Sequence, residues 1–341
     1  MAERMSISGG ERLLAGVMFL LLMAGVLLGE TNPLALSLGA NLGRGLLSRE
    51  APMPASLASA LGIFDAALSR PDATLRIADS AGLAAAFQEL GYHLDQAACC
   101  TREVPRVILS RLPADFPSLA ASGPRKTKFL EVLLPLVIAI NEEILAERGR
   151  LLEIRAHLEA GESVTLDERY WLMRLAERYG GDAEALDDLL ARVDVIPPSL
   201  ALAQAAVESG WGSSVYALAD NAPFGQYMPG ASDGQGVSAA RNGAFLHIRS
   251  FPELLDAVRA YARNLDSHPA YRGFRAVRAK ERQAGQALDG DKLAATLSRY
   301  SSRGSGYVRD LRRVMRANAL KQFDAARFAD GAPTLVLPDR G

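Results

Sequence analysis

The sequence predicts a mainly α-helical fold that includes a small α/β element ahead of most of the helices. Long stretches such as residues 126–158 repeat apolar side chains at helical spacing, and several such stretches end at glycine. Short alternating segments between residues 73 and 112 are typical of a few strands. The chain has 341 residues, of which 49% are hydrophobic and 23% charged, so it can form about two modest domains.

An uncharged apolar run at residues 13–29 is the first feature of the chain, and Arg4 and Arg12 precede it. Its length lies near the lower limit of the roughly 17–25 residues that span a bilayer. Because Leu28-Gly29-Glu30 is a poor cleavage context, we expect residues 1–30 to be an uncleaved signal anchor, with a cleaved signal peptide as the alternative. The rest of the chain should then be exported and held at the membrane.

The segment at residues 31–72 is rich in Ala, Leu, Ser, Gly and Pro and predicts a linker or tether. Residues 73–194 should form the small α/β element and then a helical region. In the α/β element we expect strands at residues 75–77, 92–94 and 104–109 and a helix at residues 83–90.

Further helices follow from periodicity, caps and glycine stops. Pro135 should kink the first of them, Thr165 is a plausible N-cap of the second, and Gly180 closes that second helix. A loop or hairpin is expected at residues 230–248, and residues 326–341 should be an extended C-terminal tail. The predicted helices are residues 126–158, 166–179, 182–192, 200–209, 252–265, 291–298 and 307–322.

Charge and cysteine content exclude several classes of protein. The 38 Lys and Arg residues nearly balance the 39 Asp and Glu residues, so the basic excess of a typical nucleic-acid-binding protein is missing. The two cysteines, Cys99 and Cys100, are adjacent and cannot form a disulfide framework. The four histidines are dispersed without a metal-ligand spacing, so we expect no metal and no cofactor.

One short helix carries the residues that predict chemistry. Ser199 is its expected N-cap, Gly210 ends it, and only Gln204 and Glu208 interrupt its small hydrophobic side chains. A helix that is apolar all round is buried, and its C-terminal end is the negative pole of the helix dipole, so the pKa of Glu208 should be raised. A general acid needs such a carboxyl group. Glu208 could instead bond a backbone amide or pair with an arginine.

The run AQAAVESGWGSS at residues 203–214, followed by NAPFGQY at 221–227, resembles the glucosaminidase domain of bacterial peptidoglycan hydrolases. This domain is glycoside hydrolase family 73, and the likeness is to its Bax branch, which is related to FlgJ. It covers residues 195–325, and residues 104–150 resemble the helical region that precedes the domain in Bax-like proteins. The resemblance implies a lysozyme-like, mainly α fold with a small β lobe, and peptidoglycan glycan strands as the substrate.

The resemblance also implies roles for individual residues. Glu208 matches the general acid that protonates the glycosidic oxygen between N-acetylglucosamine and N-acetylmuramic acid, and Tyr300 matches a tyrosine that supports the active site. Many members carry a second acidic residue about forty positions later, where this chain offers only Asp220 and Asp233. The predicted substrate-binding residues are Gln204, Asn221, Phe224, Gly225, Gln226 and Tyr227.

The missing second carboxylate leaves the mechanism and the function open to alternatives. We favour a substrate-assisted route in which the acetamido oxygen of the sugar attacks, with Asp233 as an alternative base or simply a solvated loop residue. A lytic transglycosylase and a catalytically weak glycan-binding or scaffolding module are the competing functions. The expected location is the bacterial cell envelope, anchored in the inner membrane and facing the periplasm, or periplasmic if residues 1–30 are cleaved.

Overall fold

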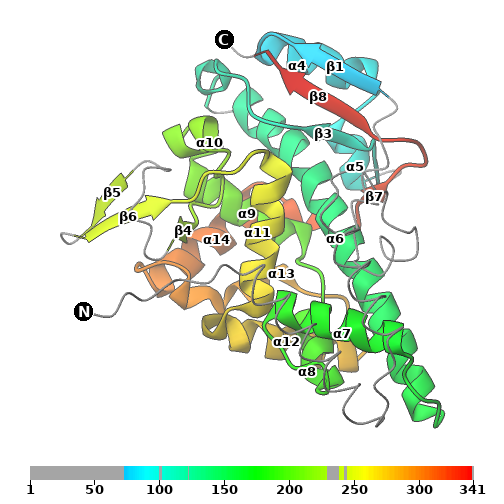
Figure 1. Ribbon diagram of the computed structural model, residues 1–341. Helices are drawn as coiled ribbons and strands as arrows, with labels where there is room; N and C mark the ends of the chain where they lie inside the picture. Colours follow the sequence, from blue (N-terminus) through cyan, green and yellow to red (C-terminus); the bar gives the residue numbers. More distant parts are fainter. Residues whose placement is uncertain (1–72, 100–101, 122, 229–237, 242–243, 340–341) are drawn as a thin grey trace, which may run out of the picture. The chain divides into compact units, whose positions relative to one another are not determined.

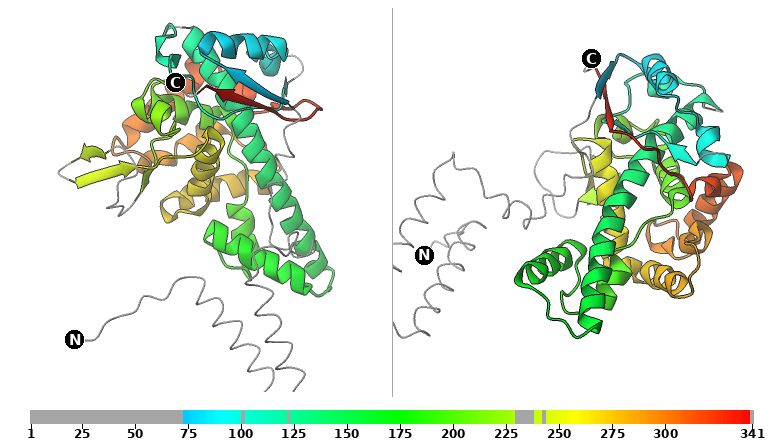
Figure 2. Two further views of the ribbon diagram at one scale, coloured as in Figure 1. Left: turned by 45° about the horizontal axis from the view of Figure 1, so that its top comes forward. Right: turned by 90° about the vertical axis from the view of Figure 1, so that its right-hand side faces the viewer.

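Helix α6 (Pro124–Glu159) is the longest element among the described residues, and elements from both ends of the described part of the chain pack along it (Figure 1). The structure is a computed structural model and describes residues 73–99, 102–121, 123–228, 238–241 and 244–339. Figure 2 shows a small sheet at one end of α6 and helix α7 (Leu166–Tyr179) at the other. Helices dominate this part of the chain, so the predicted mainly α fold class is confirmed.

The sheet at one end of α6 is parallel and joins the two ends of the described chain. Strand β8 (Thr334–Pro338) is central, between β1 (Ala73–Ile77) and β3 (Val107–Leu109), so that Ala73 and Val107 both pair with Thr334. The predicted C-terminal tail is extended, but it is an integral strand. Short strands β2 (Glu103–Val104) and β7 (Arg327–Phe328) form a second parallel pair beside it.

The predicted α/β element at residues 73–109 is present, with two corrections. Residues 92–94 do not form a strand, because helix α5 (Leu94–Cys99) begins there and Tyr92 packs edge-on against Phe87 of α4 (Ser80–Glu89). The strand predicted at 104–109 is broken into β2 and β3. Pro105 lies at the break, where it supplies no backbone N–H for a sheet hydrogen bond.

The helical region follows the sequence closely. In α7 the Thr165 side chain accepts a hydrogen bond from the backbone of Glu168, and the Glu168 carboxylate accepts one from the backbone of Thr165, which completes a capping box. Gly180 ends α7 in the left-handed conformation that glycine tolerates. Helix α8 (Leu186–Arg192) is shorter than predicted, since Asp182 and its neighbours form a turn.

Helix α9 (Pro198–Ser209) lies at the centre of the fold and contacts α6, α13 and α14. It begins two residues earlier than predicted, so Ser199 is inside its first turn and is not the N-cap. The backbone N–H of Ser199 donates to Asp324 Oδ1 at 2.8 Å and its hydroxyl donates to Oδ2 at 3.0 Å. A distant carboxylate therefore satisfies the start of α9, while Gly210 ends it as predicted.

The remaining elements include another small sheet and several helices and 3₁₀ turns. An antiparallel sheet has the strand order β4–β6–β5, which confirms the hairpin expected within residues 230–248. Helix α12 (Arg272–Gln283) was not predicted as a helix. The other elements are α10 (Val215–Ala219), β4 (Tyr227–Met228), β5 (Ser238–Arg241), β6 (Ala244–Ile248), α11 (Leu254–Ser267), α13 (Gly290–Ala294), α14 (Ser305–Ala317) and the 3₁₀ turns η2 (Phe116–Ser118), η3 (Pro269–Tyr271), η4 (Leu297–Arg299) and η5 (Leu320–Phe323).

One hydrophobic cluster runs from Ile77 to Val336 and includes buried faces of α6, α9 and α11. Residues on both sides of position 195 contribute to it, so the predicted domain boundary there stays a prediction. Within the described ranges, no helix has both the length and the apolar character needed to cross a bilayer. The apolar run at residues 13–29 lies outside those ranges, and its role as an anchor is likewise still a prediction.

Candidate active site

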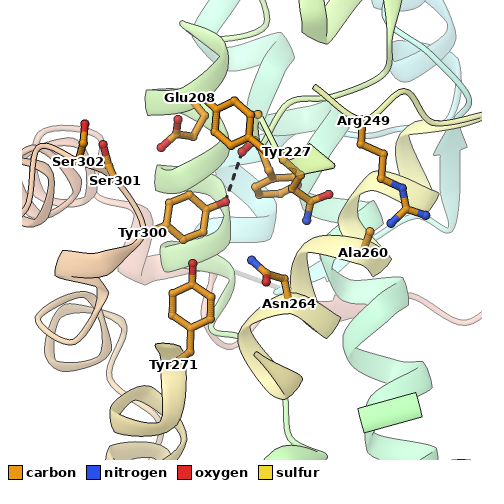
Figure 3. Close-up of a pocket in the computed structure, with 12 residues that line it drawn as sticks. Glu208, Tyr227, Arg249, Ala260, Asn264, Tyr271, Tyr300, Ser301 and Ser302 are labelled. Atoms are coloured by element: carbon orange, nitrogen blue, oxygen red, sulfur yellow. Dashed lines mark hydrogen bonds between the residues drawn. The ribbon is translucent and has the colours of Figure 1, made fainter. Parts of the chain in front are cut away.

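A hollow of about 270 Å³ opens beside the last turn of α9 (Figure 3). Its volume is close to the lower end of the range for small-molecule sites, roughly 300–1,000 Å³. Side chains from α9, from the segment before β4, from α11 and from the turns around residues 271 and 300 converge on it. The lining consists of Glu208, Phe224, Gly225, Gln226, Tyr227, Arg249, Ala260, Asn264, Tyr271, Tyr300, Ser301 and Ser302.

Glu208 is the acidic residue among the described residues that line this hollow. Its side chain is half-buried, and burial raises its pKa above the ordinary value of 4.5. A hydrogen bond from Tyr307 and the positive charge of Arg303 lower the pKa in part. The direction expected from the apolar surroundings of α9 is therefore confirmed, and burial is the main cause.

The carboxylate of Glu208 has no cation in direct contact. Among the described residues, no side-chain nitrogen of Lys, Arg or His lies within 4.0 Å of it. Arg303 acts on Glu208 only at longer range, because its guanidinium is paired with Asp310. The structural alternative, a glutamate held in an arginine salt bridge, does not apply to Glu208.

A chain of hydrogen bonds leads from the core to Glu208. The Tyr261 hydroxyl donates to Gln204 Oε1 at 2.8 Å, and Gln204 Nε2 donates to the Tyr307 hydroxyl at 3.1 Å. The amide orientation makes Tyr307 an acceptor towards Gln204. The Tyr307 proton is thus left for Glu208, with which Tyr307 also forms a hydrogen bond.

Gln204, which was predicted to bind substrate, does not line the hollow. Its side chain is fully buried, with 0% exposure, and both of its amide atoms are bonded to tyrosines. The sequence correctly predicts that Gln204 lies on the same face of α9 as Glu208. Tyr261 and Tyr307 cover this face at Gln204, however. Gln204 positions Tyr307 from behind the pocket.

Residues 224–227 form one wall of the hollow, as the sequence predicted. The ring of Phe224 is stacked on Tyr261 with centroids 4.0 Å apart, so the wall is fixed to α11. Gly225 has a positive φ of 58°, and a Cβ there would lie 3.8 Å from Glu208 Oε2. Gln226 and the exposed Tyr227 complete the wall, and Gln226 Oε1 is buried without a hydrogen-bond partner among the described residues.

Tyr300 lies directly beside Glu208 in the pocket (Figure 3). Its hydroxyl donates to the backbone carbonyl of Phe224 at 3.3 Å, and its ring is stacked on Tyr307 with centroids 5.5 Å apart. Burial raises its pKa well above 10, so the hydroxyl keeps its proton at neutral pH. Tyr300 is suited to hold the wall at Phe224 in place and unsuited to act as a base.

Asn221 does not line the hollow, in contrast to the prediction. It is buried, adopts a positive φ of 49°, and its side-chain nitrogen donates to the carbonyls of Phe251 and Pro252 at 3.0 Å. Asparagine tolerates this left-handed backbone better than most residues. Asn221 therefore links the segment before the 224–227 wall to the segment that leads into α11.

Several lining residues were not singled out from the sequence. Asn264 of α11 and Tyr271 of η3 line the hollow (Figure 3). Both lie within residues 195–325, which resemble the family, but the resemblance gives neither of them a role. Tyr307 was likewise inside a matching segment, and its distance of 99 positions from Glu208 concealed their contact.

Asp233, the alternative base, lies outside the described residues. Glu253, at the start of α11, is not part of the hollow. Within the described ranges, no cluster of three or more His, Cys, Asp or Glu side chains has the arrangement of a metal site.

Comparison with known proteins identifies the family. Residues 183–320 match the glucosaminidase family model, described as mannosyl-glycoprotein endo-beta-N-acetylglucosaminidase. The chain is 33% identical over 204 residues to protein bax of Escherichia coli strain K12, which covers 58% of this chain and 71% of that protein. It also matches the catalytic domain of the autolysin Auto from Listeria monocytogenes, at 19% identity and a TM-score of 0.30, over 50% of this chain and 94% of that domain.

The two sequence matches agree with the resemblance carried by residues 203–214 and 221–227, and the pocket with its half-buried Glu208 lies inside the matched region. The protein therefore belongs to the Bax-like family with a glucosaminidase domain, and it is a glycoside hydrolase of the endo-β-N-acetylglucosaminidase class.

Proposed function

We propose that the protein hydrolyses the glycan backbone of peptidoglycan between N-acetylglucosamine and N-acetylmuramic acid, with Glu208 as the general acid. The observation that carries this proposal is the state of Glu208, a half-buried carboxyl group with a raised pKa and no contacting cation, at the wall of an open hollow. A carboxylic acid that is protonated near neutral pH can donate its proton to a leaving-group oxygen. Such catalysis contributes about 10²–10⁴-fold in rate.

The neighbours of Glu208 suit both of its protonation states. Before the reaction, burial favours the neutral acid. After the proton passes to the glycosidic oxygen, the hydrogen bond from Tyr307 and the charge of Arg303 stabilise the carboxylate that is left. Gln204 keeps the Tyr307 proton directed towards Glu208, because the other side of that hydroxyl accepts from its amide.

The second chemical group is supplied by the sugar in this proposal. The acetamido oxygen of N-acetylglucosamine attacks the anomeric carbon as the glycosidic bond breaks, and water then opens the cyclic intermediate. Asn264, Tyr271 and the buried Gln226 Oε1 are polar groups of the hollow that can orient an acetamide. Glu208 is the acidic lining residue in the described part of the chain, which supports a route with one protein carboxylate.

The place of action follows from the substrate. Peptidoglycan lies outside the inner membrane, so we place the protein in the cell envelope. The apolar run at residues 13–29 supports a membrane anchor or an export signal.

Digestion of purified sacculi with the purified protein tests the proposed reaction. Mass spectrometry should find soluble fragments with reducing N-acetylglucosamine ends. Fragments with anhydromuramic ends would identify a lytic transglycosylase instead, and the absence of soluble fragments would indicate a glycan-binding module.

The variant Asp233→Asn tests the substrate-assisted route. It should hydrolyse sacculi at a rate within about threefold of the unmodified protein, because in this route Asp233 is not the base. Loss of a true general base would lower the rate by at least about 10²-fold. A loss as large as that of Glu208→Gln would show that two carboxylates act.

A further inference from the structure

A second hollow, of about 530 Å³, adjoins the first along α11. Arg249, Ala260 and Asn264 line both hollows, so the two are neighbours along α11. In Figure 3, Arg249 and Ala260 lie on the side of the pocket away from Ser301 and Ser302. The second hollow continues from there over the surface of α11 between Asp256 and Ser267, which corresponds to roughly 16 Å of helix.

Two of the three arginines that line the second hollow form no ion pair within the described residues, although the charge of Glu147 acts on Arg263 at longer range. Arg249 and Arg263 are both exposed, and within the described ranges neither has an ion-pair partner. Arg259 differs, since it forms ion pairs with Glu143 at 2.9 Å and Asp256 at 2.9 Å. Arg259 thus fixes α11 to α6, while Arg249 and Arg263 remain available to a ligand.

Two available guanidinium groups favour a ligand that bears carboxylates. Arginine presents a planar fork of N–H donors that matches a carboxylate in two parallel hydrogen bonds. The sugar rings of peptidoglycan are neutral, but N-acetylmuramic acid carries a lactyl group whose carboxyl carbon is joined to a peptide stem. The stem has free carboxylates, and if it is removed the lactyl group itself becomes a carboxylate.

We propose that the second hollow binds the peptide stem of an N-acetylmuramic acid near the scissile bond, with Arg249 and Arg263 on its carboxylates. This inference rests on the proposed function and specifies its substrate as peptidoglycan that still carries stems. The stem is favoured over a bare lactyl group because an extended peptide advances about 3.3 Å per residue and can follow the hollow along α11, whereas a lactyl carboxylate stays beside its sugar.

Binding to the inactive Glu208→Gln protein tests the proposal without turnover. The probes are soluble glycan strands with stems, the same strands after amidase treatment, which leaves lactyl carboxylates, and neutral chitooligosaccharides of equal length. Strands with stems should bind about 5- to 10-fold more tightly than either of the others, the effect of one or two charged hydrogen bonds in partly exposed positions. Equal affinity for strands with and without stems would overturn the proposal.

A matched pair of variants locates the effect. In the same background, Arg263→Gln should remove most of the preference for stems, and Arg263→Lys should retain part of it because the charge remains. Arg169→Gln is the control, since it removes one exposed arginine from α7 that has no ion-pair partner within the described ranges. If Arg263→Gln and Arg169→Gln keep the same preference, the assignment of the second hollow is wrong.

The failure of this inference can be told apart from failure of the proposed function. If the unmodified protein releases no fragments from sacculi, the proposed reaction fails, whatever the binding results are. If it hydrolyses strands with and without stems at equal kcat/KM, the reaction stands and the stem site is refuted.

Discussion

Glu208 and Asp194 are two poorly hydrated carboxyl groups whose acidities change in opposite directions. At Glu208 burial dominates and raises the pKa, with only a tyrosine hydroxyl in contact and Arg303 at longer range. At Asp194 burial alone would also raise the pKa, but hydrogen bonds from Arg282 and the charges of Arg278 and Arg148 lower it. Arg282 donates to both carboxylate oxygens of Asp194, at 2.8 and 3.0 Å.

The difference shows that burial disfavours the ionised form of a carboxyl group, and that the groups in contact with it determine whether the ionised form is stabilised nevertheless. A carboxylate with arginine forks around it is an ionised structural anchor. A carboxyl group with only neutral donors in contact is protonated up to a higher pH than an ordinary carboxyl group, so it is better suited to donate a proton. A substitution of Glu208 should therefore lower the activity without lowering the stability, and a substitution of Asp194 should lower the stability without lowering the activity per folded molecule.

The largest effect is expected for Glu208→Gln. The amide has nearly the same shape but no acidic proton, so hydrolysis of sacculi should fall by at least about 10²-fold. Stability should not fall: a raised pKa stabilises the folded state below the unfolded pKa, and that contribution is lost as the pH rises through the folded pKa. At neutral pH, denaturant unfolding should find Glu208→Gln at least as stable as the unmodified protein, and full residual activity would remove Glu208 from its role.

Asp194→Asn should give the reverse pattern. It leaves the exposed Arg282 and the half-buried Arg148 without the carboxylate of Asp194, so the unfolding free energy should fall by less than the about 3–5 kcal/mol typical of a fully buried ion pair. The lowered pKa of Asp194 contributes stability above its unfolded pKa, and this contribution is lost as the pH falls through the folded pKa. The variant should therefore be less stable at neutral pH, and its free energy of unfolding should fall less steeply as the pH is lowered. A loss of turnover per folded molecule as large as that of Glu208→Gln would contradict the division between the two sites.

Tyr307→Phe should sharpen the comparison by removing the one neutral donor at Glu208. Without that hydrogen bond the pKa of Glu208 should rise further, so the alkaline limb of kcat/KM against pH should move to higher pH, by about one unit or less. Tyr227→Phe is the control, because Tyr227 lines the same hollow at 49% exposure and should leave the position of that limb unchanged. An unmoved limb in Tyr307→Phe would show that the hydrogen bond has no influence on Glu208.

The smallest effect is expected for Tyr300→Phe. The change removes the 3.3 Å hydrogen bond to the Phe224 carbonyl but keeps the ring stacked on Tyr307. We expect a loss of kcat/KM of about 3- to 10-fold, the effect of one neutral hydrogen bond of about 0.5–1.5 kcal/mol. Steady-state kinetics on soluble glycan strands would measure it, and a loss of 10³-fold would give Tyr300 a direct part in proton transfer.

Local features of the fold were predictable from the sequence, and long-range pairings were not. The capping box at Thr165, the stop at Gly180 and the apolar character of α9 all depend on neighbours within one turn or two. The place of β8 depends on parallel pairing with strands more than 200 positions away, which no local pattern reveals. Asp324 replaced the expected Ser199 cap for the same reason.

The candidate site divides in the same way. Glu208 stood out because it is the carboxylate in an apolar helix, and residues 224–227 stood out through a family motif. Gln204 was on the correct helix face, yet its partners Tyr261 and Tyr307 come from α11 and α14, so its burial could not be foreseen. The sequence predicts Gln204 as a ligand contact, whereas the structure places it behind the hollow, between Tyr261 and Tyr307.

The strand order β1–β8–β3 also constrains how the protein is made. Neither β1 nor β3 pairs with the other, and both depend on β8 for their sheet hydrogen bonds. Among the described strands, β8 is the partner of both, and it is complete only after the ribosome has released the residues up to Pro338. The parallel sheet beside α6 can form only after β8 has been made. A nascent or shortened chain without β8 therefore exposes the edges of β1 and β3 that β8 would cover, and such edges favour aggregation.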